Sequence, residues 1–219
     1  MPARLILVLA LLPWLATAAQ GGAWPRAKGE GFVAASGTVE RPDEFGLYRQ
    51  SFSLFAEYGV TERLTLGVDL GGDALRMSKA IAFLRLPLGR PSRKVKLAVE
   101  IGAGQVEGET ALRPAVSVGR GIGIGKRHGW LNADTRAILF ESGAAAYETD
   151  LTAGLSLGAR VKALVQLQGG VPAQGRDYLR LASSIVYETR PGTHLEFGVT
   201  EPLSGGGERG IKLGLWRRF

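Results

Sequence analysis

The chain has 219 residues and a formal net charge of +7, from 27 lysines and arginines against 20 aspartates and glutamates. It contains no cysteine, which excludes disulfide frameworks, thiolate metal sites and cysteine nucleophiles. The basic residues are scattered and form no patch, so the sequence does not favour nucleic-acid binding. The 32 glycines are about twice the ordinary share and need a structural explanation.

The first residues have the three parts of a secretory signal peptide. Arg4 precedes the apolar run "LILVLALLPWLA", and the small residues Ala16 and Ala18 form an A-x-A cleavage site. The run is too short to cross a bilayer as a helix, which needs about 20 apolar residues. The sequence therefore predicts a signal peptide over residues 1–18, cleaved after Ala18 or Ala19, in preference to a buried N-terminal helix. The mature chain is expected to leave the cytoplasm.

Residues 19–30 form a glycine-rich leader that we predict to be flexible. From residue 31 to 219 the chain is a series of short alternating segments, separated by Gly, Pro, Asp, Ser and Thr. Their length and spacing indicate the antiparallel strands of one all-β domain. Two segments are less clear than the others. The segment 111–121 contains Pro114, which cannot donate to a ladder, and the segment 31–39 is rich in small residues, so ten strands are an alternative to twelve. The twelve candidates are 31–39, 49–59, 63–71, 76–88, 94–103, 111–121, 129–140, 146–158, 160–171, 178–188, 193–200 and 209–219.

Most segments place apolar and polar side chains on opposite faces of a strand. Two folds explain this alternation equally well. One is a soluble β-sandwich with the apolar face inside, and the other is a closed transmembrane barrel with the apolar face toward lipid. The clearest segment alternates Leu64, Leu66, Val68 and Leu70 with Thr65, Gly67, Asp69 and Gly71.

Three features favour the barrel. Many glycines share the parity of the charged residues, where small side chains relieve crowding inside a narrow barrel. One set of connections is mostly tight, whereas the other, which includes "GQVEGET", is generally longer, as in outer-membrane barrels. Aromatic residues of apolar parity lie at strand ends and predict two membrane girdles. These are Phe52 and Tyr147 near the upper rim, and Tyr58, Tyr187 and Phe219 near the lower.

The signal peptide, the even number of amphipathic strands and the final segment "IKLGLWRRF" resemble bacterial outer-membrane β-barrel proteins. The resemblance implies an outer-membrane location among lipid, and a C-terminal signal that the barrel-assembly machinery reads. Ile211, Leu213, Leu215 and Phe219 match that signal, whereas Arg217 departs from it. The "EYGVTERLTLG" hairpin and the "GAWP" leader are also similar to a group of small transporter-like barrels, some associated with phenol-degradation pathways.

The inward face of such a barrel carries charges of both signs. A mixed interior permits either a water-filled passage or a plug of ion pairs, and we expect a narrow pore or transporter for small solutes. A non-conducting structural or interaction barrel is the alternative. If a path exists, the modest basic excess favours small anions. The leader either lies in the periplasm or partly fills the lower mouth. The lumen-lining candidates are Asp69, Lys79, Arg85, Lys94, Lys96, Glu100, Asp134, Arg136, Asp150, Arg160, Lys162, Arg180, Glu196 and Lys212, with Glu57, Arg113, Glu148, Glu188, His194 and Arg218 at the same parity.

A lipid-modifying outer-membrane enzyme is the third hypothesis. It would need a serine beside a histidine near the bilayer rim, and His128 and His194 are the two histidines of the chain. Sequence spacing suggests no Ser–His pair, so we expect no catalysis. No metal-ligand spacing or calcium-loop pattern occurs, and the sequence implies no cofactor.

Overall fold

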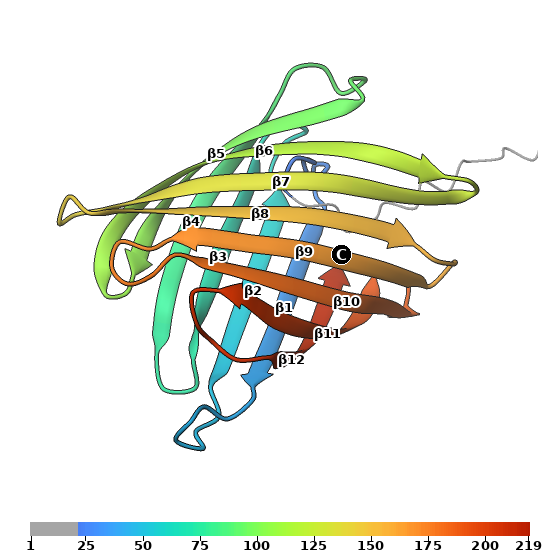
Figure 1. Ribbon diagram of the computed structural model, residues 1–219. Coiled ribbons are helices and arrows are strands. Elements are labelled where there is room, and N and C mark those ends of the chain that lie inside the picture. Colours follow the sequence, from blue (N-terminus) through green and yellow to red (C-terminus); the bar gives the residue numbers. More distant parts are fainter. Residues whose placement is uncertain (1–21) are drawn as a thin grey trace, which may run out of the picture.

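A computed structural model describes residues 22–219, so the predicted signal peptide lies outside the described residues. Twelve antiparallel strands form one closed barrel (Figure 1). Within residues 22–219, no helix is long and apolar enough to cross a membrane. The strands are β1 (Gly31–Glu40), β2 (Gln50–Gly59), β3 (Thr65–Asp73), β4 (Met77–Leu88), β5 (Val95–Val106), β6 (Glu109–Ile124), β7 (Arg127–Phe140), β8 (Ala145–Ser156), β9 (Val161–Val171), β10 (Tyr178–Arg190), β11 (Thr193–Ser204) and β12 (Gly210–Arg218).

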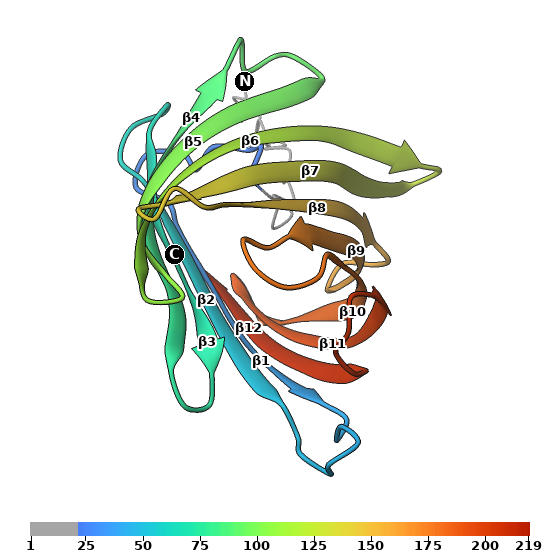
Figure 2. The ribbon, with the colours of Figure 1, turned by 60° about the vertical axis from the view of Figure 1, so that its left-hand side comes forward.

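The first and last strands close the barrel. Each strand pairs with its sequence neighbours, and β1 also pairs with β12, from Phe32 opposite Arg218 to Glu40 opposite Gly210. The blue and red ends of the sheet therefore lie side by side in both views (Figures 1 and 2). Closure gives every strand two partners, which removes the free sheet edges that a bilayer does not tolerate.

The twelve-strand prediction is confirmed, and the ten-strand alternative is wrong. The doubtful segment with Pro114 is the longest strand, β6. Pro114 pairs with Ile101 of β5. On the other side, the pairing of β6 with β7 is interrupted between Leu112 and Ala115, so Pro114 has no partner in β7. A strand can hold a proline where the ladder on one side is interrupted, because proline has no backbone N–H to donate.

The apolar face of the sheet is outside. Leu66, Leu84 and Leu131 are 41%, 44% and 47% exposed on the outer surface, although each lies within a strand. Glu57, Asp69 and other charged residues of the opposite parity are buried. A soluble sandwich would show the reverse, so the alternation of the sequence describes a barrel whose outer wall matches lipid.

Both ends of the barrel chain lie at one rim, which we call the terminal rim. There Gly31 N donates to Phe219 O at 2.7 Å and Phe219 N donates to Gly31 O at 3.1 Å. The opposite rim carries the β1–β2 loop, but its connections are not uniformly long. The predicted link "GQVEGET" is instead strand up to a two-residue turn of Glu107 and Gly108, with φ of 50° and 86°. Positive φ at both turn positions suits the twist of a tight hairpin.

Inward-facing glycines make room for large inward side chains on neighbouring strands. A Cβ on Gly67 of β3 would overlap the ring of Phe83, and a Cβ on Gly170 of β9 would lie 2.6 Å from the ring of Tyr178. A Cβ on Gly154 of β8 would overlap the indole of Trp130. The high glycine content therefore lets a narrow barrel hold bulky residues in its interior.

The five predicted girdle residues lie on the outer surface near strand ends. Phe52 and Tyr147 are near the opposite rim, and Tyr58, Tyr187 and Phe219 are near the terminal rim. All five are between 40% and 66% exposed. Two interfacial belts of aromatic rings would need this placement, and the assignment of these residues to girdles stays a prediction.

Candidate functional site

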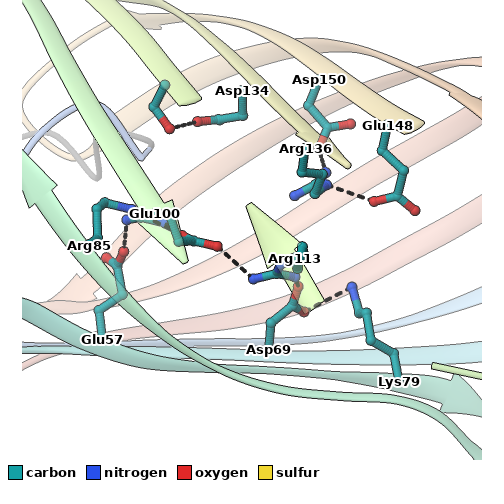
Figure 3. A network of polar contacts seen from close by, with 11 residues as sticks. Glu57, Asp69, Lys79, Arg85, Glu100, Arg113, Asp134, Arg136, Glu148 and Asp150 are labelled. Carbon is teal, nitrogen blue, oxygen red and sulfur yellow. Dashed lines mark hydrogen bonds and ion pairs between the residues drawn. The ribbon is translucent and has the colours of Figure 1, made fainter. Parts of the chain in front are cut away.

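One wall of the lumen carries a continuous row of alternating charges, which we call the charge ladder. Its members come from the leader and from β2 to β6, and Figure 3 shows those of the strands. Some successive charges belong to neighbouring strands, and the pairs Glu57–Arg85 and Arg113–Asp69 reach across one or two intervening strands. Because inward residues of adjacent strands lie opposite each other, carboxylates and cations of this wall can interdigitate. In order, the ladder is Arg26, Glu57, Arg85, Glu100, Arg113, Asp69 and Lys79.

Each inner member of the ladder has a partner on both sides. Arg85 binds Glu57 through Nη1 and lies 2.7 Å from Glu100 through Nη2. Arg113 lies 2.9 Å from Glu100 and also binds Asp69. The side chains of Arg85 and Arg113 are 8% and 2% exposed. Charges so deeply buried are tolerated when both sides are compensated, and the loss of one partner is costly.

A second group of charges lies on β7 and β8 (Figure 3). Arg136 Nε donates to Glu148 at 2.6 Å, and Arg136 Nη2 binds Asp150. Asp134 accepts from Ser117 at 2.5 Å and from Asn132. Asp134 thus has neutral donors as its hydrogen-bond partners.

The opposite wall is held by one carboxylate on β11. Glu196 accepts hydrogen bonds from Lys212 Nζ at 3.0 Å, Ser184 Oγ at 2.9 Å and Trp216 Nε1 at 3.0 Å. These donors come from β10 and β12, so Glu196 joins three strands across their inner faces. Its exposed fraction of 3% is compatible with a charge because three donors replace water.

A cavity of about 410 Å³ lies between the two walls. Equal numbers of acidic and basic side chains line it, so the wall of this cavity has no basic excess. The expected preference for anions therefore has no basis in the cavity wall. The basic residues are Arg26, Lys79, Arg85, Arg113, Arg136 and Lys212, and the acidic ones are Glu57, Asp69, Glu100, Asp134, Asp150 and Glu196.

Residues 22–26 of the leader lie inside the barrel, near the terminal rim. Arg26 Nε donates to Glu57 at 2.8 Å, and the Arg26 backbone N–H donates to Thr65 Oγ1 at 3.3 Å. Ala23 is completely buried, and Gly22 lines the cavity. The sequence predicted a flexible leader and left its place open between the periplasm and the lower mouth. The second of these alternatives describes the arrangement, because Arg26 binds Glu57 and Thr65, which both point inward near the terminal rim, whereas Ala27 is exposed at the rim.

Sequence reasoning missed an apolar cluster in the lumen near the terminal rim. Its members have the inward parity of the charged residues and are at most 8% exposed. Trp24 of the leader packs against this cluster, which explains why apolar side chains occur on a face that is otherwise polar. One sign of this cluster in the sequence is Trp216, an aromatic residue that shares the parity of the polar residues in the last strand. The cluster consists of Phe32, Trp130, Leu164, Val186 and Trp216.

The remaining lumen candidates lie toward the two rims. Arg180 Nη2 donates to Glu40 at 3.3 Å, and the Lys162 ammonium lies 3.5 Å from His194 Nε2. Lys96 is half-buried and binds the carbonyl of Pro91.

Two predicted lumen residues differ from the prediction. Lys94 lies in the connection between β4 and β5, and Arg160 lies in the connection between β8 and β9, and both are exposed. Alternation placed them on the inward face, but the strands begin one residue later, at Val95 and Val161. Outside a strand, alternation does not predict which way a side chain points. Lys94 and Arg160 therefore add charge to the terminal rim instead of to the lumen.

Comparison with known proteins identifies the class to which this fold belongs. No family model matches the chain, and no curated protein matches it. Among solved structures, it is similar to the COG4313 outer membrane channel from Pseudomonas putida F1, with a TM-score of 0.61, 11% identity and coverage of 91% of this chain and 99% of that one. It is also similar to the KdgM porin, with a TM-score of 0.65 and 7% identity over 86% of this chain and 99% of that one.

A third solved structure, the NanC porin, has a TM-score of 0.60 and 8% identity over 85% of this chain and 98% of that one. The chain therefore has the fold of bacterial outer-membrane β-barrel proteins. The expected class, which rested on the predicted signal peptide, the even number of amphipathic strands and the last strand, is confirmed as a fold, and the signal peptide stays a prediction.

Proposed function

We propose that this protein is an outer-membrane pore of narrow bore for small polar solutes, with the terminal rim facing the periplasm. The observation that carries the proposal is the cavity in the lumen, which twelve charged side chains line between the two walls. Charged walls favour water and polar solutes, whereas a barrel that served only as a wall could fill its interior with apolar side chains. The similarity to a channel and two porins supports the same function.

The balanced charges of the cavity indicate the kind of solute. Since acidic and basic groups line it in equal number, neither anions nor cations are excluded by a net field. Short-range pairing within the charge ladder weakens the field further, because each inner charge faces an opposite one. We therefore propose weak charge selectivity and selection mainly by size.

Planar-bilayer recordings test this proposal. The folded protein should give discrete current steps, both as the full mature chain and in a variant that lacks residues 22–27. A heat-dependent gel shift establishes that each sample is folded before it is recorded. If folded protein of both kinds carries no current, the pore proposal fails.

A non-conducting barrel is the second candidate, because the lumen also holds seven charges of one ladder and part of the leader. In this alternative the ion pairs support the wall, and no solute passes. The silent outcome of the recordings above supports it.

We do not propose a catalytic function. Within the described residues, His194 Nε2 lies 3.5 Å from Lys162 Nζ and 3.9 Å from Glu188 Oε1, so a lysine and a glutamate surround its ring where an acyl-transfer site needs a serine. His128 is exposed at the beginning of β7. Unchanged lipid composition after replacement of both histidines would be the expected result.

A further inference from the structure

The inner wall of the barrel leaves space for the leader beside Gly119, and we call this space and its surroundings the seat of the leader. Gly119 of β6 faces inward, and a Cβ built there would overlap the indole of Trp24 and lie 2.8 Å from the Cβ of Ala23. A larger residue at position 119 would therefore exclude the leader from this place. The wall of the barrel is shaped around these two leader residues.

The indole of Trp24 also packs against the apolar cluster in the lumen, which would otherwise face water. Trp24 packs against the cluster formed by Phe32, Trp130, Leu164, Val186 and Trp216, whose members come from β1, β7, β9, β10 and β12. The leader thus contacts β6 through Gly119, this cluster through Trp24, and β1 and β2 through Arg26, which lies against Phe32 and Glu57. A segment that spans the lumen in this way narrows any path through it.

An ion pair holds the leader next to the charge ladder. Arg26 Nε donates to Glu57 at 2.8 Å, and the guanidinium lies 4.5 Å from the ring centroid of Phe32. Behind it, the backbone of residues 29 and 30 is fixed, because Gly29 N donates to Gly59 O at 2.8 Å and Gly59 N donates to Glu30 O at 2.9 Å. Residues 22–27 are therefore a segment tethered at the terminal rim.

The leader can leave without creating an unpaired buried charge. Glu57 also binds Arg85, so its carboxylate keeps one cationic partner after Arg26 departs. Loss of the only partner of a buried charge is costly, but loss of one of two partners is less so. Arg26 itself would enter water beside the exposed residues Ala27 and Lys28 at the rim.

From these contacts we propose that residues 22–27 are a displaceable plug, which closes the pore at the terminal rim and leaves its seat when solute passes. This inference rests on the proposed pore function and adds the device that controls it. The plug is a part of the chain itself, and its seat is Gly119, the apolar cluster and Glu57.

A reversible crosslink tests the plug in the full chain. A Cβ built on Gly22 would lie 2.6 Å from both Ser117 Oγ and Asp134 Oδ1, so the pair Gly22→Cys and Ser117→Cys is within reach of a disulfide once the Asp134 side chain moves aside. No native cysteine competes for it. A matched control is Ser36→Cys with Ser53→Cys, which joins β1 to β2 inside the lumen, where the two hydroxyl oxygens are 3.1 Å apart, and leaves the leader free.

Currents are recorded before and after a reductant is added. For the plug pair we expect near-complete loss of current when oxidised and at least a several-fold increase after reduction. The control pair should conduct equally in both states, and deletion of residues 22–27 should give permanently open channels.

Three results would overturn the proposal. If the Gly22/Ser117 pair forms no disulfide, the leader does not occupy the seat. If the disulfide forms but current is equal in both states, the plug is wrong while the pore stands. If the plug pair, the control pair and the deletion variant are all folded and silent, the pore itself is wrong, and the plug falls with it.

Discussion

Arg113 and Glu100 form the central contact of the charge ladder, with Nη2 of the arginine 2.9 Å from Oε1 of the glutamate. Each also has a second partner of opposite charge, Asp69 for the arginine and Arg85 for the glutamate. Their side chains are 2% and 6% exposed, so water does not replace a missing partner. The contact therefore joins two ion pairs into one row that crosses from β3 to β6.

Replacement of Arg113 by methionine should destabilise the barrel strongly. Asp69 keeps Lys79 and Glu100 keeps Arg85, but both lose one of two cations in a buried setting. Removal of one partner of a buried pair costs about 3–5 kcal/mol, and we expect the lower end of this range. Urea unfolding in detergent micelles, followed by tryptophan fluorescence, measures the change.

Arg76→Met is the matched control for this prediction. Arg76 lies 2.9 Å from Glu107, but both side chains are more than half exposed. Its loss should lower the free energy of unfolding by less than about 1 kcal/mol. Equal effects of the two substitutions would show that the ladder does not hold the wall together.

Substitution of Gly154 by alanine should destabilise the barrel, because the new methyl group would overlap Trp130. Overpacking of this kind costs about 1–3 kcal/mol, and the fluorescence of the displaced indole should change as well. Gly121→Ala is the control, since a Cβ there meets nothing within 4 Å. That variant should stay within about 1 kcal/mol of the parent, and a similar loss at both positions would contradict the steric explanation.

The fold could be predicted from the sequence because a strand has a period of two. Alternation fixes which side chains share a face, and glycines at the parity of the charges indicate which face is inside. Girdle positions follow from the same count, as Tyr58 and Tyr147 illustrate on the outer surface. These are local properties, and each can be read within about ten residues.

The site could be predicted only in part, because its contacts depend on which strands meet. Parity placed Arg113 and Asp69 inside, but their ion pair joins residues 44 positions apart. The leader has no period, so nothing local tells that Trp24 enters the lumen beside Gly119. Strand ends are also not encoded by parity, which explains the misplacement of Lys94 and Arg160 in exposed connections.

An arginine on the outer wall should be costly at the middle of a strand and cheap at its end. Val116 lies in the middle of β6 and is 49% exposed, and Ile124 is the last residue of the same strand at 57%. In lipid vesicles, Val116→Arg should cost about 2–4 kcal/mol and Ile124→Arg about 0–1 kcal/mol. Urea unfolding from the vesicles measures both. Equal costs would mean that the outer wall does not meet hydrocarbon at its middle.

Ion selectivity should change with Lys212 but not with Lys94. In channels that lack residues 22–27, and therefore Arg26, five basic and six acidic groups line the cavity, so Lys212→Gln raises the acidic excess from one to two and should favour cations. A single charge a few ångströms from a permeating ion in water interacts with it by about 0.5–1 kcal/mol, which changes the occupancy of the cavity by that ion about two- to five-fold. Reversal potentials in a salt gradient, recorded on channels that lack residues 22–27, measure the change. Lys94→Gln is the control, and an equal shift there would place the selective region at the terminal rim.

The last residue offers a way to separate structure from assembly. Phe219 N donates to Gly31 O at 3.1 Å and the phenyl ring covers Gly31, yet the residue is 66% exposed on the outer wall. If the barrel-assembly machinery reads this terminal ring, Phe219→Ala should reduce the folded protein in cells several-fold while refolding into detergent in vitro stays efficient. Arg217→Ala, at the position that departs from the signal, should leave both yields unchanged or improve the yield in cells. The heat-dependent gel shift measures folded yield in both settings, and an equal loss in cells and in vitro would assign Phe219 to barrel closure alone.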